Sequence, residues 1–151
     1  MPRIIAGSAK GRKIAAPEGT ATRPTSDRAR EALFSALNSQ LTSWAGRRFL
    51  DLYAGSGAVG LEAASRGASA VVLVESHAPA LAALRSNIAL LGFTSTSVVA
   101  STVERFAQLT AEPFDVIFAD PPYDTGSQAV KSAVANLLAN GAAKAGTIVV
   151  V

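Results

Sequence analysis

The stretch of the sequence most suggestive of chemistry is FDVIFADPPYD, residues 114–124. Its apolar beginning is typical of a buried strand, and the run ends on the carboxylate of Asp120. Two prolines follow at once, which predicts at least a rigid turn. Pro122 also restrains Pro121, because the residue before a proline is held in an extended conformation, and this fixes the direction of the Pro121 carbonyl group. The choice between a turn and a site depends on what else lies at the same edge of the sheet.

Asp120, Pro121 and Tyr123 have the groups needed to hold the amino group of a nucleobase. Such a nitrogen is a poor nucleophile because its lone pair is delocalised into the ring. The Asp120 carboxylate and the Pro121 carbonyl could accept its two hydrogens and direct the lone pair at a methyl sulfonium, an orientation worth several kcal/mol. Tyr123 offers a flat face for an extruded base. We therefore predict that Asp120, Pro121, Pro122 and Tyr123 are the catalytic residues of methyl transfer to an amino nitrogen.

A second candidate site is the glycine-rich connection in FLDLYAGSGAVGLEAASRG, residues 49–67. Gly55, Gly57 and Gly60 form a G-x-G-x-x-G pattern between a predicted strand and a predicted helix. Glycines at this spacing let the backbone approach a nucleotide, and the following helix presents free N–H groups. Glu75 ends the next predicted strand, where a carboxylate can accept hydrogen bonds from both ribose hydroxyls. The alternative is a glycine-rich connection that binds no ligand.

Asp51 favours S-adenosyl-L-methionine over a dinucleotide as the ligand of this connection. It stands on the strand just before the glycines. A carboxylate there could face the cationic amino-acid end of S-adenosylmethionine, whereas it would repel a pyrophosphate. The sequence therefore predicts S-adenosyl-L-methionine as the cofactor.

The elements that must position these residues alternate strictly between strand and helix from residue 48 onward. The predicted strands are 48–53, 70–75, 96–101, 114–120 and 147–151, and the predicted helices are 57–66, 78–91, 103–109 and 127–139. Continuous Val, Ile and Leu runs indicate strands covered on both faces, and the alternation predicts an α/β fold with a doubly wound, mostly parallel sheet. In the expected strand order 3-2-1-4-5 the fourth strand lies beside the first. Asp120 would then face the glycine loop across the sheet edge.

The N-terminal segment differs in character from the rest of the chain. Residues 3–17 read as a hairpin, followed by a helix for which Thr25 or Ser26 is the candidate N-cap. The first 30 residues hold seven basic and two acidic groups, which suggests a polyanionic partner; the alternative, equally compatible with the charge alone, is a solvated basic terminus that binds nothing. We predict residues 1–25 as a basic, RNA-facing arm and residues 26–151 as the cofactor-binding domain. The predicted RNA-binding residues are Arg3, Lys10, Arg12, Lys13, Arg23 and Arg28.

Composition excludes several classes of protein. With 151 residues, 49% of them hydrophobic, the chain has room for the core of one domain. It contains no cysteine, which excludes thiolate metal sites and disulfides, and its one histidine leaves no metal-ligand pattern. No apolar run approaches the ~20 residues of a membrane span, so we expect a cytoplasmic protein. We also expect a monomer. The chain stops inside the predicted strand 147–151, so we expect the C-terminal strands of the fold to be missing.

The N-terminal GSAKGRKIAAPEGTATRPTSDRAREALFSAL, together with FLDLYAGSGAVGLEAASRGA and ADPPY, resembles the RsmD-type methyltransferases of small-subunit (16S) rRNA. The resemblance implies a Rossmann-like class I methyltransferase that transfers a methyl group from S-adenosylmethionine to guanine N2 in 16S rRNA, free or within a partly assembled small ribosomal subunit. It assigns the ribose to Glu75 and the target base to Asp120, Pro121 and Tyr123. An acidic residue often contacts the adenine at the end of the third strand in this family, where this sequence has Ser101 and Thr102. The cofactor-binding residues implied are Asp51, Tyr53, Ala54, Gly55, Ser56, Gly57, Glu75, Ser76, Ser101 and Thr102.

Three other functions share parts of this pattern. A DNA amino-methyltransferase, acting on adenine N6 or cytosine N4, would use the same DPPY chemistry but would usually need an added recognition domain. A nicotinamide-dependent oxidoreductase would share the fold and the glycine pattern, yet it leaves DPPY without a role. An inactive RNA-binding module would leave both candidate sites unexplained. Methylation at cytosine C5 is disfavoured, because its usual route needs a cysteine nucleophile.

Overall fold

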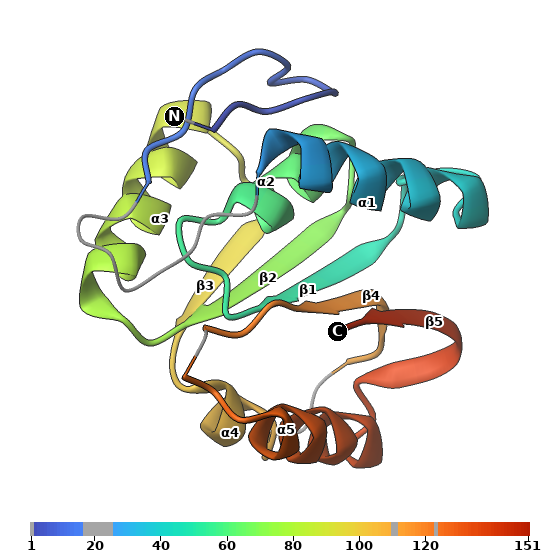
Figure 1. The fold of residues 1–151 in the computed structure, drawn as a ribbon. Helices are drawn as coiled ribbons and strands as arrows, with labels where there is room; N and C mark the ends of the chain where they lie inside the picture. Colours follow the sequence, from blue (N-terminus) through green and yellow to red (C-terminus); the bar gives the residue numbers. More distant parts are fainter. Residues whose placement is uncertain (1, 17–25, 110–111, 123) are drawn as a thin grey trace.

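The computed structural model describes residues 2–16, 26–109, 112–122 and 124–151. These residues form five helices and five strands. Figure 1 shows their arrangement. The helices are α1 (Asp27–Gln40), α2 (Ala58–Ser65), α3 (Ala78–Leu91), α4 (Val103–Phe106) and α5 (Ser127–Ala139). The strands are β1 (Arg48–Leu52), β2 (Ala70–Glu75), β3 (Thr96–Ala100), β4 (Phe114–Ala119) and β5 (Ala143–Val150).

The strands form one sheet in the order β3-β2-β1-β4-β5, which confirms the predicted topology. All four neighbouring pairs are parallel. The centre of the sheet is β1, where Leu52 is paired with Val74 of β2 and with Ala119 of β4. The residues that follow these three strands therefore meet at one edge of the sheet, on either side of the point where the strand order reverses.

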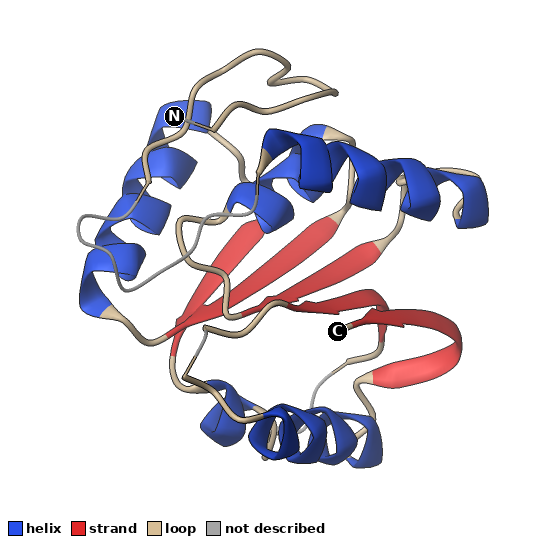
Figure 2. Cartoon of the chain, viewed as in Figure 1, coloured by secondary structure: helices blue, strands red, loops and turns tan. Residues whose placement is uncertain are grey.

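Helices cover both faces of the sheet, as Figure 2 shows. Helices α1, α2 and α3 pack on one face over Phe49, Leu73 and Val116, whereas α4 and α5 pack on the other over Leu50 and Ile117. Two-sided burial explains why the strands read as continuous apolar runs. The described part of the chain contains no helix that is both long and apolar enough to cross a membrane.

Two element boundaries differ from the sequence prediction by more than one residue. Strand β5 begins at Ala143, four residues earlier than predicted, because Gly146 (φ +89°) allows an irregularity in its pairing with β4. Thr147 stabilises this irregularity, since its hydroxyl donates to the carbonyl of Phe114 at 2.7 Å and accepts from the Lys144 N–H at 2.9 Å. Helix α4 ends at Phe106, so the predicted helix 103–109 was too long.

The N-terminal hairpin is reduced to one antiparallel bridge between Arg3 and Lys13. Ile4 and Ile14, which neighbour the two bridge residues, are 1% and 0% exposed and form a small core with residues of α2. The arm, which we define as residues 2–16, is therefore packed on the domain rather than free in solvent. Ser26 is the N-cap of α1, its hydroxyl accepting from the Ala29 N–H at 3.1 Å, while the alternative candidate Thr25 lies outside the described residues.

Candidate active site at the carboxyl ends of the strands

The glycine loop, residues 53–57, joins β1 to α2 through a series of left-handed residues. Tyr53, Gly55 and Gly57 have φ values of 56°, 60° and 89°. A Cβ atom on Gly57 would lie 2.4 Å from Leu84 Cδ1, so glycine is required there by packing as well as by conformation. A Cβ atom on Gly55 would meet no heavy atom within 4 Å. The loop is therefore packed against α3 at Gly57 and open at Gly55, as a loop that receives a ligand must be.

Glu75, the last residue of β2, holds the glycine loop from the neighbouring strand. Its Oε1 accepts from the Gly55 N–H at 2.7 Å, and its Oε2 accepts from the N–H groups of Ser76 at 3.1 Å and His77 at 2.9 Å. A carboxylate has about four acceptor positions, so these three bonds leave about one for another donor. The residue predicted to bind ribose thus also orders the loop beneath it.

Asp51 lies on β1 beneath the glycine loop and is only 1% exposed. Its Oδ2 accepts from the Gly60 N–H at 2.9 Å. Burial raises its pKa to about 8; the hydrogen bond from Gly60 opposes this shift, and the negative charges of Glu75 and Asp120 add to it. The three carboxylates therefore act on one another, which makes this edge of the sheet a place where a cation would be stabilised.

The DPPY stretch lies beside the glycine loop, because β4 pairs with β1 and ends at Ala119, one residue before Asp120. Asp120 and Pro121 are half-buried, and Pro122 is exposed with its carbonyl accepting from the Thr125 N–H at 3.0 Å. This turn leads into α5. Tyr123 lies outside the described residues.

The polar residues after β3 are engaged locally. Ser101 N–H donates to the Glu75 carbonyl at 3.0 Å, and its hydroxyl donates to the Thr102 carbonyl at 2.9 Å. The Thr102 hydroxyl caps α4 by accepting from the Arg105 N–H at 3.2 Å. Both hydroxyls already have backbone partners, so contact of Ser101 and Thr102 with an adenine remains a prediction.

Tyr53, Ala54, Ser56 and Ser76 surround the same edge. The Ala54 N–H donates to the Val74 carbonyl at 2.9 Å, Ser56 is buried, and Ser76 is exposed. The Tyr53 ring packs on the α4–α5 side of the sheet, and its hydroxyl is buried with no hydrogen-bond partner in the described part of the chain. Desolvation, and then the charge of Glu104, raise the pKa of this hydroxyl.

The basic residues of the N-terminal segment are mostly at the surface. The exposed ones among the predicted RNA-binding residues are Arg3, Lys10, Arg12, Lys13 and Arg28, and Arg23 lies outside the described residues. Arg12 also donates to the Leu90 carbonyl at 3.3 Å. Arg30, which adds to the positive charge of this segment in the sequence, is fully buried and paired with Asp27 at 2.7 Å. Its charge is therefore not part of the surface.

Sequence reasoning missed the residues of α2 that hold the arm. Glu62 is fully buried, and its carboxylate accepts from the N–H groups of Ile5 at 2.8 Å and Ala6 at 3.0 Å and from Arg66 Nε at 2.9 Å. Gly7 passes so close to α2 that a Cβ atom there would lie 1.9 Å from the Ser65 carbonyl oxygen. The sequence did contain one signal. Glu62 is the only charged residue of the helix AVGLEAAS, and a single charge in an otherwise small and apolar helix indicates a buried, hydrogen-bonded carboxylate.

The sheet order, the glycine loop after β1 and the acidic residue at the end of β2 define a Rossmann-like class I methyltransferase fold. The described residues include no group of His, Cys, Asp or Glu that could hold a metal ion.

Comparisons with known proteins agree with this class. A family model described as "Conserved hypothetical protein 95" matches residues 2–151. The chain is 39% identical over 124 residues to "Ribosomal RNA small subunit methyltransferase D" of Escherichia coli K12, covering 82% of this chain and 61% of that protein. It is 37% identical over 138 residues to the protein of the same name from Buchnera aphidicola (Acyrthosiphon pisum), covering 91% and 69%. The chain thus spans about three fifths of the length of the E. coli relative.

A solved structure of a hypothetical protein from Thermus thermophilus superposes with a TM-score of 0.85 at 39% identity, covering 99% of this chain and 84% of that one. The chain belongs to the RsmD-type methyltransferase family.

Proposed function

We propose that this chain carries the catalytic site of an S-adenosylmethionine-dependent methyltransferase that modifies guanine N2 in 16S rRNA. The observation that carries the proposal is the convergence of Asp51, Glu75 and Asp120 at one sheet edge, where burial and then the negative charges of Glu75 and Asp120 raise the pKa of Asp51. A site with this charge favours a cationic ligand. It disfavours the pyrophosphate of a nicotinamide dinucleotide, which argues against an oxidoreductase on the same fold.

The residues around the glycine loop fit S-adenosylmethionine. Glu75 would accept from the ribose with the acceptor position it retains, or exchange one of its backbone N–H partners for a hydroxyl. Asp51 would stabilise the positive end of the cofactor from beneath the loop, and the open side of Gly55 leaves room for close approach. When bound, S-adenosylmethionine supplies a methyl group on a positively charged sulfur.

The DPPY residues would hold the target base. The Asp120 carboxylate and the Pro121 carbonyl accept from the two amino hydrogens, which turns the nitrogen lone pair toward the cofactor side of the sheet edge. Tyr123 provides the face on which the base stacks. The methylated nitrogen passes its surplus proton to water, because an aminium of this kind is acidic. Orientation rather than general-base catalysis then supplies most of the rate.

The substrate assignment draws on the family and on the arm. The names of the E. coli and Buchnera relatives are those of small-subunit rRNA methyltransferases. The arm exposes Arg3, Lys10, Arg12 and Lys13, whose charges suit an RNA backbone. We propose 16S rRNA as the partner, free or in a partly assembled small subunit, and a monomeric enzyme with the arm facing RNA and residues 26–151 binding the cofactor.

The test combines cofactor binding with product identification. Calorimetric titration should give binding of S-adenosylmethionine and none of NAD. Single-turnover transfer of a tritiated methyl group should label 16S rRNA, and nucleoside mass spectrometry should identify the product as N2-methylguanosine. Labelling of duplex DNA in place of RNA would replace the proposal by a DNA amino-methyltransferase, and binding of NAD alone would replace it by an oxidoreductase. Cofactor binding without transfer to any nucleic acid would leave only the cofactor assignment standing.

A further inference from the structure

Asn87 of α3 joins the arm to the glycine loop. This side chain is 1% exposed and makes three hydrogen bonds, all of them to backbone groups. Its Oδ1 accepts from the Ala15 N–H at 2.8 Å, and its Nδ2 donates to the Ala15 carbonyl at 2.9 Å and to the Ser56 carbonyl at 3.0 Å. Ala15 lies near the end of the arm, and Ser56 lies between Gly55 and Gly57. One buried amide thus bonds simultaneously to the predicted RNA-binding and cofactor-binding segments.

The rest of the arm is fixed to α2, the helix that begins at the glycine loop. Besides the Glu62 bonds, the Ser65 hydroxyl donates to the Ala6 carbonyl at 2.6 Å and accepts from the Ala9 N–H at 3.0 Å. These contacts hold residues 5–9 at the far end of α2. They do not touch the glycine loop, so Asn87 is the described side chain that bonds directly to both segments.

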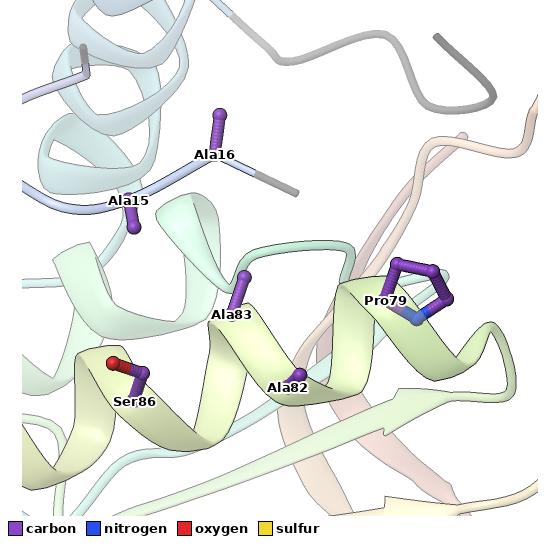
Figure 3. A pocket seen from close by; sticks show the side chains of 6 residues that line it. All are labelled: Ala15, Ala16, Pro79, Ala82, Ala83 and Ser86. Atoms are coloured by element: carbon purple, nitrogen blue, oxygen red, sulfur yellow. The ribbon is translucent and has the colours of Figure 1, made fainter. Parts of the chain in front are cut away.

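Packing beneath the end of the arm is incomplete. A cavity of about 310 Å³ lies here. Figure 3 shows Ala15 and Ala16 on one side of it and side chains of α3, among them Ala82 and Ala83, on the other. Small side chains across a cavity make few dispersion contacts. The two hydrogen bonds between Ala15 and α3 are both made by the Asn87 amide, while the neighbouring Ile14 packs in the same small core as Ile88 and Leu91 of α3. The amide is therefore the direct polar link between Ala15 and the Ser56 carbonyl.

We propose that Asn87 is a positioning residue that couples the two segments, so that ordering the glycine loop around the cofactor also orders the end of the arm for RNA. This inference rests on the proposed function. Coupling between two binding sites is reciprocal, so the cofactor should raise RNA affinity by the same factor by which RNA raises cofactor affinity. Typical factors are about 5–150-fold, and a single buried amide places the expectation at the lower end, roughly fivefold.

Hydrogen exchange of the Ala15 amide tests the coupling without RNA or turnover. The probe is S-adenosylhomocysteine, the demethylated cofactor, added to saturation as judged by calorimetry. In the parent protein we expect exchange at Ala15 to slow about fivefold, together with slowing at Gly55 and Gly57. Failure of S-adenosylhomocysteine and S-adenosylmethionine to bind would overturn the proposed function and the coupling with it. Binding that protects the glycine loop but leaves Ala15 unchanged would overturn the coupling alone.

Two variants of Asn87 separate positioning from general stability. Asn87→Asp keeps an oxygen that can accept from the Ala15 N–H but removes the N–H donors to the Ser56 and Ala15 carbonyls, so Ala15 should keep part of its basal protection and lose its response to the cofactor. Asn87→Ala should lose both. The matched controls are Ser65→Ala, which removes an arm contact remote from the loop, and Asn140→Ala, which removes an amide bonded to the Ala107 carbonyl on the opposite face. Both controls should keep the response at Ala15, and loss of the response in Asn140→Ala would contradict the assignment to Asn87.

Discussion

The two ends of the sheet contain buried aspartates of opposite character. Asp51, toward the carboxyl ends of the strands, is 1% exposed, and Asp115, near the amino ends, is 6% exposed. Burial and neighbouring carboxylates raise the pKa of Asp51 to about 8. Burial also acts to raise the pKa of Asp115, but the Arg48 N–H, Lys144 and Arg47 together hold it below its usual value. The pKa values of these two buried aspartates are therefore shifted in opposite directions.

The partners explain this difference. The Asp115 carboxylate accepts from the Arg48 N–H at 2.8 Å and lies 3.4 Å from Arg47 Nη1 and 3.2 Å from Lys144 Nζ. Within the described residues, Asp51 and Glu75 take part in no salt bridge. The neighbouring charge with the largest effect on the Asp51 pKa is another carboxylate, Glu75. A compensated charge stabilises the fold, whereas an arrangement that raises a carboxyl pKa costs stability and marks a candidate site. Substitutions at the two ends should therefore separate activity from stability.

The largest effect is expected at the carboxyl end, from Asp120→Ala. Single-turnover methyl transfer should fall by at least ~100-fold, the usual scale for loss of one positioned polar group in a transition state. Melting curves and calorimetry with S-adenosylmethionine check separately that the variant folds and that it binds the cofactor. Asp120→Asn should retain more activity than Asp120→Ala, since one oxygen acceptor remains. Transfer at the parent rate by Asp120→Ala would reduce the DPPY stretch to a rigid turn.

Glu75→Ala should weaken cofactor binding by roughly 1–3 kcal/mol, the scale for losing hydrogen bonds to a charged acceptor. The structure adds a second reason. In Glu75→Ala the Gly55 N–H loses its hydrogen-bond acceptor, so the glycine loop is no longer held in place from β2. Glu75→Gln, which keeps one oxygen, is the matched variant and should lose less. Calorimetry with S-adenosylmethionine measures both, and an unchanged dissociation constant in Glu75→Ala would mean that the ribose is held elsewhere.

At the amino end, Asp115→Ala should lower the free energy of unfolding by about 1–2 kcal/mol. The Arg48 N–H loses its acceptor, whereas Arg47 and Lys144, whose side chains are 34% and 53% exposed, can turn to water. Urea unfolding measures the loss. Cofactor affinity in the folded variant should match that of the parent, and a parallel loss of affinity would show that the two ends are not independent.

The pH dependence of stability should have opposite signs for the two aspartates. Folded Asp51 keeps its proton up to about pH 8, whereas the unfolded chain releases it near 3.8, so its contribution makes the free energy of unfolding fall as pH rises through this window. The slope is at most about 1.4 kcal/mol per pH unit for one proton. Asp115 has a lowered pKa, so the stability it contributes is present above the ordinary aspartate pKa and is lost as pH falls through the lowered value.

Unfolding curves from pH 3 to pH 9 for Asp51→Asn and Asp115→Asn check these signs. Asp51→Asn should remove the decline between about pH 4 and pH 8, and Asp115→Asn should remove part of the loss in acid. A cationic cofactor should also lower the Asp51 pKa, so binding near neutral pH should release protons in the parent and fewer in Asp51→Asn. Equal decline of stability in parent and Asp51→Asn would mean that Asp51 titrates normally.

Much of this fold could be predicted from the sequence, for reasons that particular strands make clear. Strands β1, β2 and β4 contain nearly continuous apolar runs bounded by turns, and the edge strand β3 keeps a Val-Val pair, so the positions of all four were predicted to within one residue. Strand β5 begins in AKAG, whose small and polar residues show no such pattern, and its irregular pairing depends on the Thr147 hydroxyl. Local pattern does not contain that information.

Within the candidate site, Asp51 and Glu75 could be located because strand ends and glycine spacing are local features. The bonds that Glu75 makes to the glycine loop could not be predicted, because backbone N–H groups carry no sequence signal. Glu62 and Asn87 were missed for the same reason, since their partners are backbone groups 57 and 72 residues away in the chain. Residues that join distant segments through the backbone become visible only in three dimensions.

The docking of the arm has a consequence for the order in which the protein is made. Ala15 is synthesised before Asn87, which follows it by 72 residues. At about 5–20 residues per second, the ribosome needs roughly 4–14 s to reach it. Throughout that interval the most basic part of the chain lacks the helices that hold it. The final position of the arm is therefore decided only once α3 has emerged, and the nascent arm meets the RNA-rich surroundings of the ribosome before it meets the helices that hold it.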